Sequence, residues 1–204
     1  MGYHLAGFDV TGVDIMPQPN YPFTFKQDDA LEYIAAHGHE YDVIHASPPC
    51  QAHSALTTGT NKGRVYPELI PPTRAALDAL GRPYVIENVQ GAPVRRDITL
   101  CGEMFGLGVI RHRHFELGGW SMMQPAHVKH RGRVAGWRHG VLVEGPYFQV
   151  YGDGGRKGSV ADWQRAMGID WTDVRRELAE AIPPAYAEAI GLSLMDHLRE
   201  QVPA

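Results

Sequence analysis

Cys50 is the side chain in this sequence with the clearest capacity for covalent chemistry. A lone cysteine is more often a small buried hydrophobic residue than a nucleophile. Here, however, Pro48 and Pro49 stiffen the chain just before it, and a strand expected at 41–46 would present its sulfur at the edge of a sheet. A nucleophile needs such a fixed position, and it needs nearby positive charge to favour the thiolate.

Glu87 is the second candidate, because it ends an apolar run that begins at Pro83. Burying a carboxylate is unfavourable unless the group is paired or functional. Partial burial raises the pKa of a carboxyl group and lets it donate a proton near neutral pH. Taken alone, Glu87 could equally be a strand-end acid bonded to a loop amide.

The elements that would position these residues alternate between strands and helices, which predicts an α/β fold with a mostly parallel sheet and helices on both faces. Strands are expected at 8–15, 23–26, 41–46 and 83–86, and helices from 30, after an Asp29 cap, and from 67 or 72 to 81. Ligands of open sheets bind beyond the carboxyl ends of the strands. Asp14, residues 47–51 and Glu87-Asn88 occupy three such ends, so we expect one shared crevice.

The second half of the chain is less regular. Residues 118–158 are rich in Gly, Trp, His and Arg and predict a small irregular lobe. The pattern becomes helical again from Ser159 or Asp162, and Pro183-Pro184 separates the last two helices. We therefore expect a core at 1–117, a lobe at 118–158 and C-terminal helices at 159–204 that return to the core.

Composition bounds the class of protein. The 204 residues, 44% of them hydrophobic, are ordinary for a globular domain with a substantial core. No apolar stretch reaches the length of a membrane span, and no export signal is recognisable, so no membrane association is expected. Two cysteines cannot form a disulfide framework, which favours a reduced, cytoplasmic setting.

Charge is unevenly distributed in this acidic chain, whose net charge is −4. The basic residues between 111 and 139 are Arg111, Arg113, Lys129, Arg131, Arg133 and Arg138, against a single acid, Glu116. Such a strip could be the footprint of a polyanion, although without motif support a solvated surface is the simpler explanation. His112, His114 and Cys101 show no recognised zinc-ligand spacing, so we expect no metal.

Several segments, in order, resemble the motifs of one enzyme family. Ser47-Pro48-Pro49-Cys50-Gln51 and Glu87-Asn88-Val89 are similar to the two signature motifs of DNA cytosine-C5 methyltransferases, and Arg111-His112-Arg113 is similar to their Arg-x-Arg pair that opens a strand. Residues 2–15 resemble the helix and second strand of the family, and residues 177–191 resemble its last motif. The resemblance implies a Rossmann-like, S-adenosylmethionine-dependent methyltransferase sheet with a small target-recognition lobe.

The activity implied by this resemblance is transfer of a methyl group from S-adenosylmethionine to C5 of cytosine in double-stranded DNA. Cys50 would add to C6 while Glu87 holds or protonates N3, so that C5 can take the methyl group. Arg113, with Arg111 beside it, would steady the pyrimidine and the thiolate. The target base must leave the helix, so base flipping is implied.

The same resemblance assigns binding residues. Asp14 would accept hydrogen bonds from the ribose, and Asp29, or Asp28 in the other register, would lie near the adenine amine. The full set expected around the cofactor is Asp14, Ile15, Asp29, Ala30, Pro48 and Pro49. DNA contacts are expected from Gln51, Ser54 and Asn88, and phosphate contacts from Arg131, Arg133, Arg138, Arg156 and Lys157.

The sequence departs from the family pattern in two ways. Members open with a strand and a glycine-rich turn that lies against the cofactor, whereas this sequence begins after that turn, so the first strand of the expected sheet is missing. A start site placed too late, a second chain that supplies the piece, or loss of methylation could each explain this. The small lobe at 118–158 predicts a short or relaxed target sequence.

Other functions remain open at this stage. The same chemistry could act on RNA or on a free nucleotide, and the chain could be a non-catalytic DNA-binding remnant that keeps only the base pocket. A generic nucleotide-binding α/β domain is the plainest alternative. A monomer is expected in each case.

Overall fold

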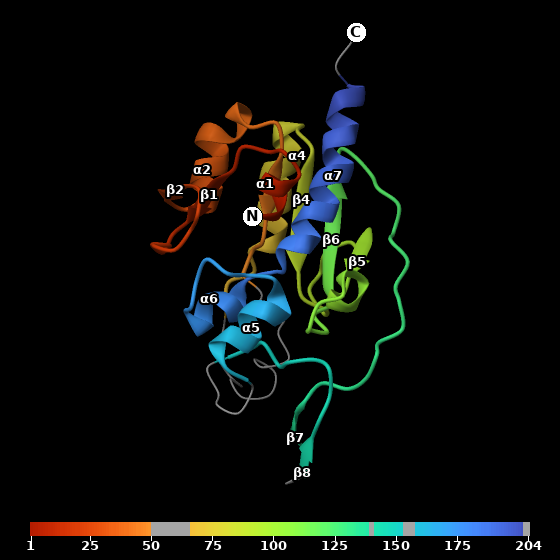
Figure 1. Ribbon diagram of the computed structural model, residues 1–204. Coiled ribbons are helices and arrows are strands. Elements are labelled where there is room, and N and C mark those ends of the chain that lie inside the picture. The colour runs from red at the N-terminus through yellow and green to blue at the C-terminus, as the bar shows by residue number, and fades with distance from the viewer. Residues whose placement is uncertain (50–65, 139–140, 153–157, 202–204) are drawn as a thin grey trace.

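The computed structural model describes residues 1–49, 66–138, 141–152 and 158–201, with only the backbone described at 137 and 138 (Figure 1). The strands are β1 (Thr11–Asp14), β2 (Thr24–Gln27), β3 (Ile44–Ala46), β4 (Tyr84–Asn88), β5 (Ile98–Leu100), β6 (Arg113–Gly118), β7 (Gly136–Arg138) and β8 (Val141–Val143). The helices are α1 (Gly2–Leu5), α2 (Ala30–His37), α4 (Ile70–Leu80), α5 (Val160–Met167), α6 (Arg175–Glu180) and α7 (Pro184–Glu200), with short 3-10 turns η1 (Gly38–Glu40) and η2 (Gly102–Phe105). The chain therefore has a mixed α/β fold, as the sequence predicts.

The strands form small sheets instead of one mostly parallel sheet. β1 pairs with β2 in parallel, and a separate four-stranded sheet has the order β3-β4-β6-β5. In that sheet only β3 and β4 are parallel, because β6 runs antiparallel to both β4 and β5. The expectation of a mostly parallel arrangement is wrong for the described strands. The physical reason is that residues 101–112, which join β5 to β6, contain only the 3-10 turn η2 and no α-helix, whereas a parallel pair usually needs a helical crossover.

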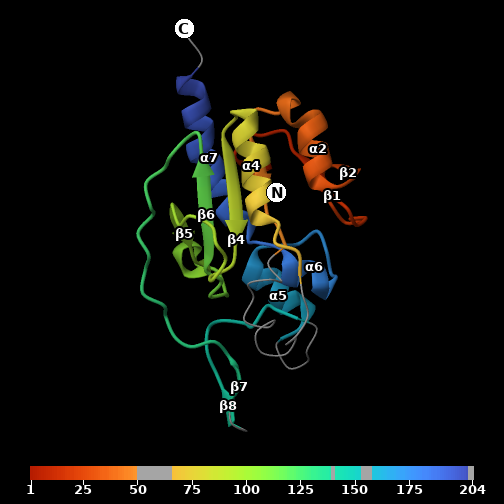
Figure 2. The ribbon, with the colours of Figure 1, turned by 180° about the vertical axis from the view of Figure 1, so that it is seen from behind.

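Helices cover both faces of the four-stranded sheet, as expected (Figures 1 and 2). On one face α7 packs Tyr186, Ile190 and Leu194 against a cluster that includes Val85 of β4 and Phe115 of β6. On the other face α4 and α2 pack against side chains that include Ile86 of β4. The opposite directions of Val85 and Ile86 follow from the two-residue alternation of a strand.

Local signals explain where several elements begin. Asp29 caps α2, since its carboxylate accepts hydrogen bonds from the backbone N–H groups of Leu31 and Glu32. Ser159 caps α5 in a reciprocal arrangement with Asp162, which decides between the two starts expected from the sequence. β6 begins at Arg113, so the Arg-x-Arg segment does open a strand.

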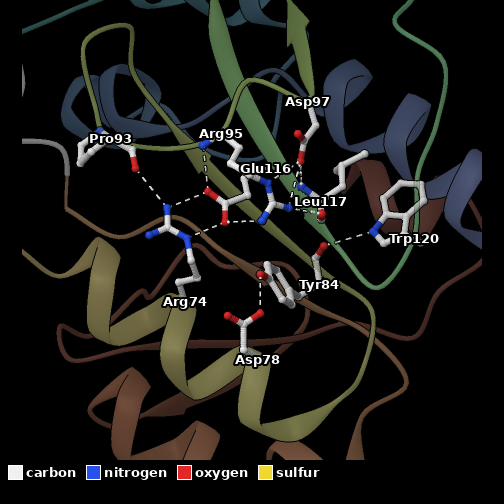
Figure 3. A network of polar contacts seen from close by, with 9 residues as sticks. All are labelled: Arg74, Asp78, Tyr84, Pro93, Arg95, Asp97, Glu116, Leu117 and Trp120. Carbon is white, nitrogen blue, oxygen red and sulfur yellow. Dashed lines mark hydrogen bonds and ion pairs between the residues drawn. The ribbon is translucent and has the colours of Figure 1, made fainter.

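A buried ion network fixes β6 against α4 (Figure 3). Glu116 is fully buried and accepts hydrogen bonds from the Arg74 guanidinium at 2.6 and 2.7 Å and from the backbone N–H of Arg95 at 2.9 Å. Asp97 accepts a hydrogen bond from the backbone N–H of Leu117 at 2.8 Å and pairs with Arg95. The network therefore sets the position of the strand that also carries Arg113.

The segment that follows β6 forms an extended strap, defined here as residues 119–133, along the outer side of the sheet to the β7–β8 hairpin (Figures 1 and 2). Trp120 anchors its start by donating from its indole nitrogen to the carbonyl of Tyr84 at 3.1 Å. Gln124 pairs with the backbone N–H and carbonyl of Thr99 at 2.7 and 2.9 Å, and thus satisfies the outer edge of β5. The small lobe expected at 118–158 is thus mainly a strap and a hairpin.

Candidate functional site

A cavity of about 370 Å³ opens between β1, β3 and α2. This volume lies within the range of pockets that hold small molecules and cofactors, roughly 300 to 1,000 Å³. The residues expected around the cofactor all line it, namely Asp14, Ile15, Asp29, Ala30, Pro48 and Pro49. Three segments that are distant in sequence thus meet at one crevice beyond strand ends.

The two acids of the cavity differ in how much hydrogen-bonding capacity they have left. Asp14 accepts from the backbone N–H of Met16 at 2.8 Å and from the Gln18 amide at 3.2 Å, one bond to each oxygen. A carboxylate has about four acceptor positions, so Asp14 can still accept from a ligand. Asp29 uses one oxygen for both bonds of the helix cap, which leaves its other oxygen for a ligand. Of the neighbouring acids Asp28 and Asp29, it is Asp29 that lines the cavity.

Glu87 lies at the end of β4, where it is 6% exposed. Its carboxylate forms an ion pair with Arg113 of β6, with 2.9 Å between Oε1 and Nε. Burial raises the pKa of Glu87, although the charge of Arg113, a hydrogen bond from the Ser47 hydroxyl and the charge of Arg111 oppose that rise. Glu87 is therefore a buried acid whose protonated form is favoured more than usual, as proton donation requires.

A chain of hydrogen bonds connects this acid to the cavity wall. The Tyr3 hydroxyl lies 2.6 Å from Nδ1 of His45, Nε2 of His45 lies 3.2 Å from the Ser47 hydroxyl, and Ser47 hydrogen-bonds to Glu87. When Glu87 is ionised, Ser47 must donate to it, so His45 donates to Ser47 and Tyr3 donates to His45. Burial lowers the pKa of His45 to about 4, which keeps the ring neutral in this role. Sequence reasoning missed His45 and Tyr3, and the only signal was a histidine within an apolar strand.

Asn88 holds the loop that leads to Cys50. Its side chain is 1% exposed and donates to the carbonyl of Pro48 at 2.9 Å. This contact gives Asn88 a positioning role, and the DNA contact expected from the sequence stays a prediction. Cys50 itself, with Gln51 and Ser54, lies outside the described residues.

The two arginines of the Arg-x-Arg segment do different things. Arg113 contacts Glu87, as described above. The Arg111 guanidinium donates instead to the carbonyls of Val150, at 2.7 Å, and Ala179. Arg111 is 8% exposed and thereby ties the end of the lobe and α6 to the strand. Arg113 thus forms the ion pair with the candidate acid, and Arg111 contributes its charge.

The residues expected to contact phosphates are placed only in part. Arg131 pairs with Glu103 at 2.8 Å, donates to the carbonyl of Leu107 at 3.1 Å and lies over the Tyr147 ring. A phosphate would have to compete with Glu103 for this guanidinium. Arg133 is exposed. The side chain of Arg138, and the whole of Arg156 and Lys157, lie outside the described residues.

The expectation that no metal site is present is wrong. Cys101, His112, His127 and His130 bring one ligand atom each to within 4.8 Å of one another, an arrangement that could hold a metal ion. His114 is not part of this group, because its Nδ1 lies 2.9 Å from the Thr99 hydroxyl. The cluster could not be recognised in the sequence, because its members come from separate segments and their spacing matches no short ligand motif.

Comparison with known proteins adds no assignment. No protein-family model matches the sequence, and no curated protein matches it either. Among the described residues, no helix has both the length and the apolar character needed to cross a membrane.

Proposed function

We propose that this chain carries the catalytic machinery of an S-adenosylmethionine-dependent DNA cytosine-C5 methyltransferase. One observation carries the proposal: Ser47 lines the cavity and also hydrogen-bonds to Glu87, so the candidate cofactor pocket and the candidate acid are one contact apart. The chain then passes through Pro48 and Pro49 directly to Cys50. A methyl donor, an acid and a thiol are the three groups that this chemistry requires.

The residues have defined tasks in this reaction. The Cys50 thiolate adds to C6 of a flipped cytosine, and the electron pair displaced from the ring is accommodated by protonation of N3 from Glu87. S-adenosylmethionine bound in the cavity would supply the methyl group to C5 as an electrophile and would depart as the neutral thioether. Transfer of the C5 proton to water, return of the N3 proton to Glu87 and expulsion of the Cys50 thiolate then restore the aromatic ring. Arg113 holds Glu87 in place at 2.9 Å, and the buried setting keeps this acid able to donate.

The architecture is compatible with a methyltransferase sheet divided at its centre. Within the described part of the chain, β1 has one strand neighbour, β2, and β3 has one, β4. The cavity is lined by β1 on one side and by β3 on the other. A strand between them would join the two sheets into one, in the position where the family resemblance places its first strand. Such a strand would occupy the part of the cavity between β1 and β3 and would leave the part beyond the strand ends, at Ile15, Pro48 and Pro49, for the cofactor.

Transfer of radiolabelled methyl groups from S-adenosylmethionine tests the proposal. Labelled 5-methylcytosine should form in duplex DNA and should be lost in the Cys50→Ser and Glu87→Gln variants. Asp14→Asn should weaken binding of S-adenosylhomocysteine roughly tenfold or more, because it weakens a charge-assisted hydrogen bond to the ribose. Asp9→Asn is the matched control, since Asp9 is exposed and is not among the residues around the cavity.

The same assay separates the other possibilities. If the label appears in RNA or in a free nucleotide and not in DNA, the same chemistry acts on that substrate instead of DNA. DNA binding without any binding of S-adenosylhomocysteine would indicate a non-catalytic remnant and would refute the proposal.

A further inference from the structure

Four potential metal ligands meet where the strap passes the end of β5 and the start of β6. Cys101 follows β5 and is fully buried, and His112 immediately precedes β6. His127 and His130 belong to the strap, and His127 is exposed. The cluster is therefore shared between the framework of the sheet and a segment without regular secondary structure.

Distances within the cluster are close to those of a tetrahedral centre. Zinc bonds of about 2.0–2.1 Å to nitrogen and 2.3 Å to sulfur place two nitrogen ligands about 3.3 Å apart and a sulfur and a nitrogen about 3.6 Å apart. Here Nε2 of His112 lies 3.1 Å from Nε2 of His127, and Sγ of Cys101 lies 3.4 Å from Nε2 of His130. Since all four ligand atoms lie within 4.8 Å of one another, only the longer separations need to shorten on binding.

The types of ligand also indicate which cation the cluster would bind. Three imidazoles and one thiolate form a nitrogen and sulfur set that favours zinc over calcium or magnesium.

We propose that Cys101, His112, His127 and His130 bind one Zn²⁺ in a closed structural site that fixes the strap to the end of β5 and the start of β6. Four protein ligands leave no open position for substrate, so the ion stabilises and does not react. His112 lies between Arg111 and Arg113, so the ion also secures the backbone next to the arginine that pairs with Glu87. The zinc site itself does not depend on the proposed methyl transfer.

Metal binding by untagged, full-length protein tests the proposal. After removal of bound metal with a chelator and dialysis, the protein should take up one equivalent of Zn²⁺. Co²⁺ in its place should give the visible bands of a tetrahedral centre and a sulfur-to-cobalt charge-transfer band. Cys101→Ser should abolish the charge-transfer band, whereas Cys50→Ser should retain it, which assigns the thiolate to one of the two cysteines. If Cys101→Ser retained the charge-transfer band, the proposal would be overturned.

Single-ligand variants test the remaining assignments. His127→Ala is suited to this, because an exposed side chain can be removed without disturbing the core. It should weaken Zn²⁺ binding by roughly a hundredfold or more, beyond the ten- to hundredfold loss typical of an outer hydrogen-bond partner. Lys129→Ala, in the same strap, and His39→Ala, at an exposed position outside it, should bind Zn²⁺ as the wild type does. Equal affinities in all three variants would refute the site.

Proteolysis and thermal unfolding test whether the bound ion fixes the strap in place. Trypsin should cleave after the exposed Lys129 at least tenfold more slowly when Zn²⁺ is bound, and Zn²⁺ at a hundredfold excess over its Kd should raise the Tm by roughly 5 to 10 °C. Binding of one Zn²⁺ with no change in cleavage or Tm would leave a metal site without the fastening role and would contradict that part of the proposal.

Discussion

Glu116→Gln removes the charge at the centre of the network in Figure 3 and keeps the size of the side chain. The wild-type carboxylate is fully buried and accepts three hydrogen bonds, two from Arg74 and one from the backbone of Arg95. Nη1 of Arg95 lies a further 3.3 Å from Oε1. The substitution also replaces one acceptor by an amide NH₂ group, which points its hydrogens toward a guanidinium.

The expected loss of stability follows from these contacts. A hydrogen bond to a charged group contributes about 1.5–3 kcal/mol, and breaking a fully buried ion pair costs about 3–5 kcal/mol. The side chains of Arg74 and Arg95 are 28% and 51% exposed, so water can solvate them after the change. We therefore expect a loss of about 3 kcal/mol, near the lower end of that range, and a decrease in Tm of about 6–12 °C for a chain of this length.

Thermal and urea unfolding of purified variants measure this effect. Glu180→Gln is the matched control, because Glu180 forms an exposed helix pair with Arg176 at 2.9 Å, and such pairs contribute about 0.3–0.5 kcal/mol. Burial alone would raise the pKa of Glu116, but the hydrogen bonds from Arg74 and Arg95 and the charges of both together lower it. This contribution to stability is present above pH 4.5 and is lost as the pH falls through the lowered folded-state pKa of Glu116. The free energies of unfolding of wild type and Glu116→Gln should therefore become equal in acid. Equal unfolding midpoints for Glu116→Gln and Glu180→Gln at pH 7 would refute the reasoning.

Three further substitutions test other parts of the structure. Because burial raises the pKa of Glu87, its ionisation opposes folding above pH 4.5, so Glu87→Gln should gain stability relative to wild type as the pH rises, while losing activity; a variant that instead loses stability relative to wild type with rising pH in urea titrations would contradict this. Asn88→Ala leaves the Pro48 carbonyl without its 2.9 Å donor and should lower the free energy of unfolding in urea by about 1–3 kcal/mol. It should also lower kcat for methyl transfer. An unchanged free energy of unfolding and an unchanged kcat would contradict a positioning role for Asn88. A methyl group added at Gly118 would lie 2.0 Å from the Tyr84 ring, so Gly118→Ala should lower stability by about 1–3 kcal/mol, and a wild-type Tm would contradict this close packing.

Much of the fold could be predicted because its signals are local. The Asp29 cap and the strand that ends at Asp14 each depend on residues within a few positions of one another, whereas the strand that opens at Arg113 was expected from the motif resemblance. One general rule, that residues after successive strands meet beyond their carboxyl ends, grouped Asp14 with residues 47–49, whereas Asp29 and Ala30 were expected at the cofactor from the motif resemblance.

The remaining features depend on contacts between distant segments. Arg111 and Arg113 are equivalent in the sequence, and only the positions of Val150 and Ala179 show that one binds backbone carbonyls while the other binds Glu87. The antiparallel course of β6 and the path of the strap are likewise tertiary features. The metal cluster escaped detection for the same reason, since the strap must fold back along the sheet before its histidines reach Cys101.

Covalent trapping on DNA that contains 5-fluorocytosine is a direct test of Cys50 as the nucleophile. Fluorine at C5 cannot leave as a proton does, so a methylating enzyme remains bonded to its base through the nucleophilic sulfur. We expect an adduct that requires S-adenosylmethionine and is lost in Cys50→Ser. Protein that binds both DNA and S-adenosylhomocysteine, yet forms no adduct, would contradict the assignment of Cys50 and with it the proposed reaction.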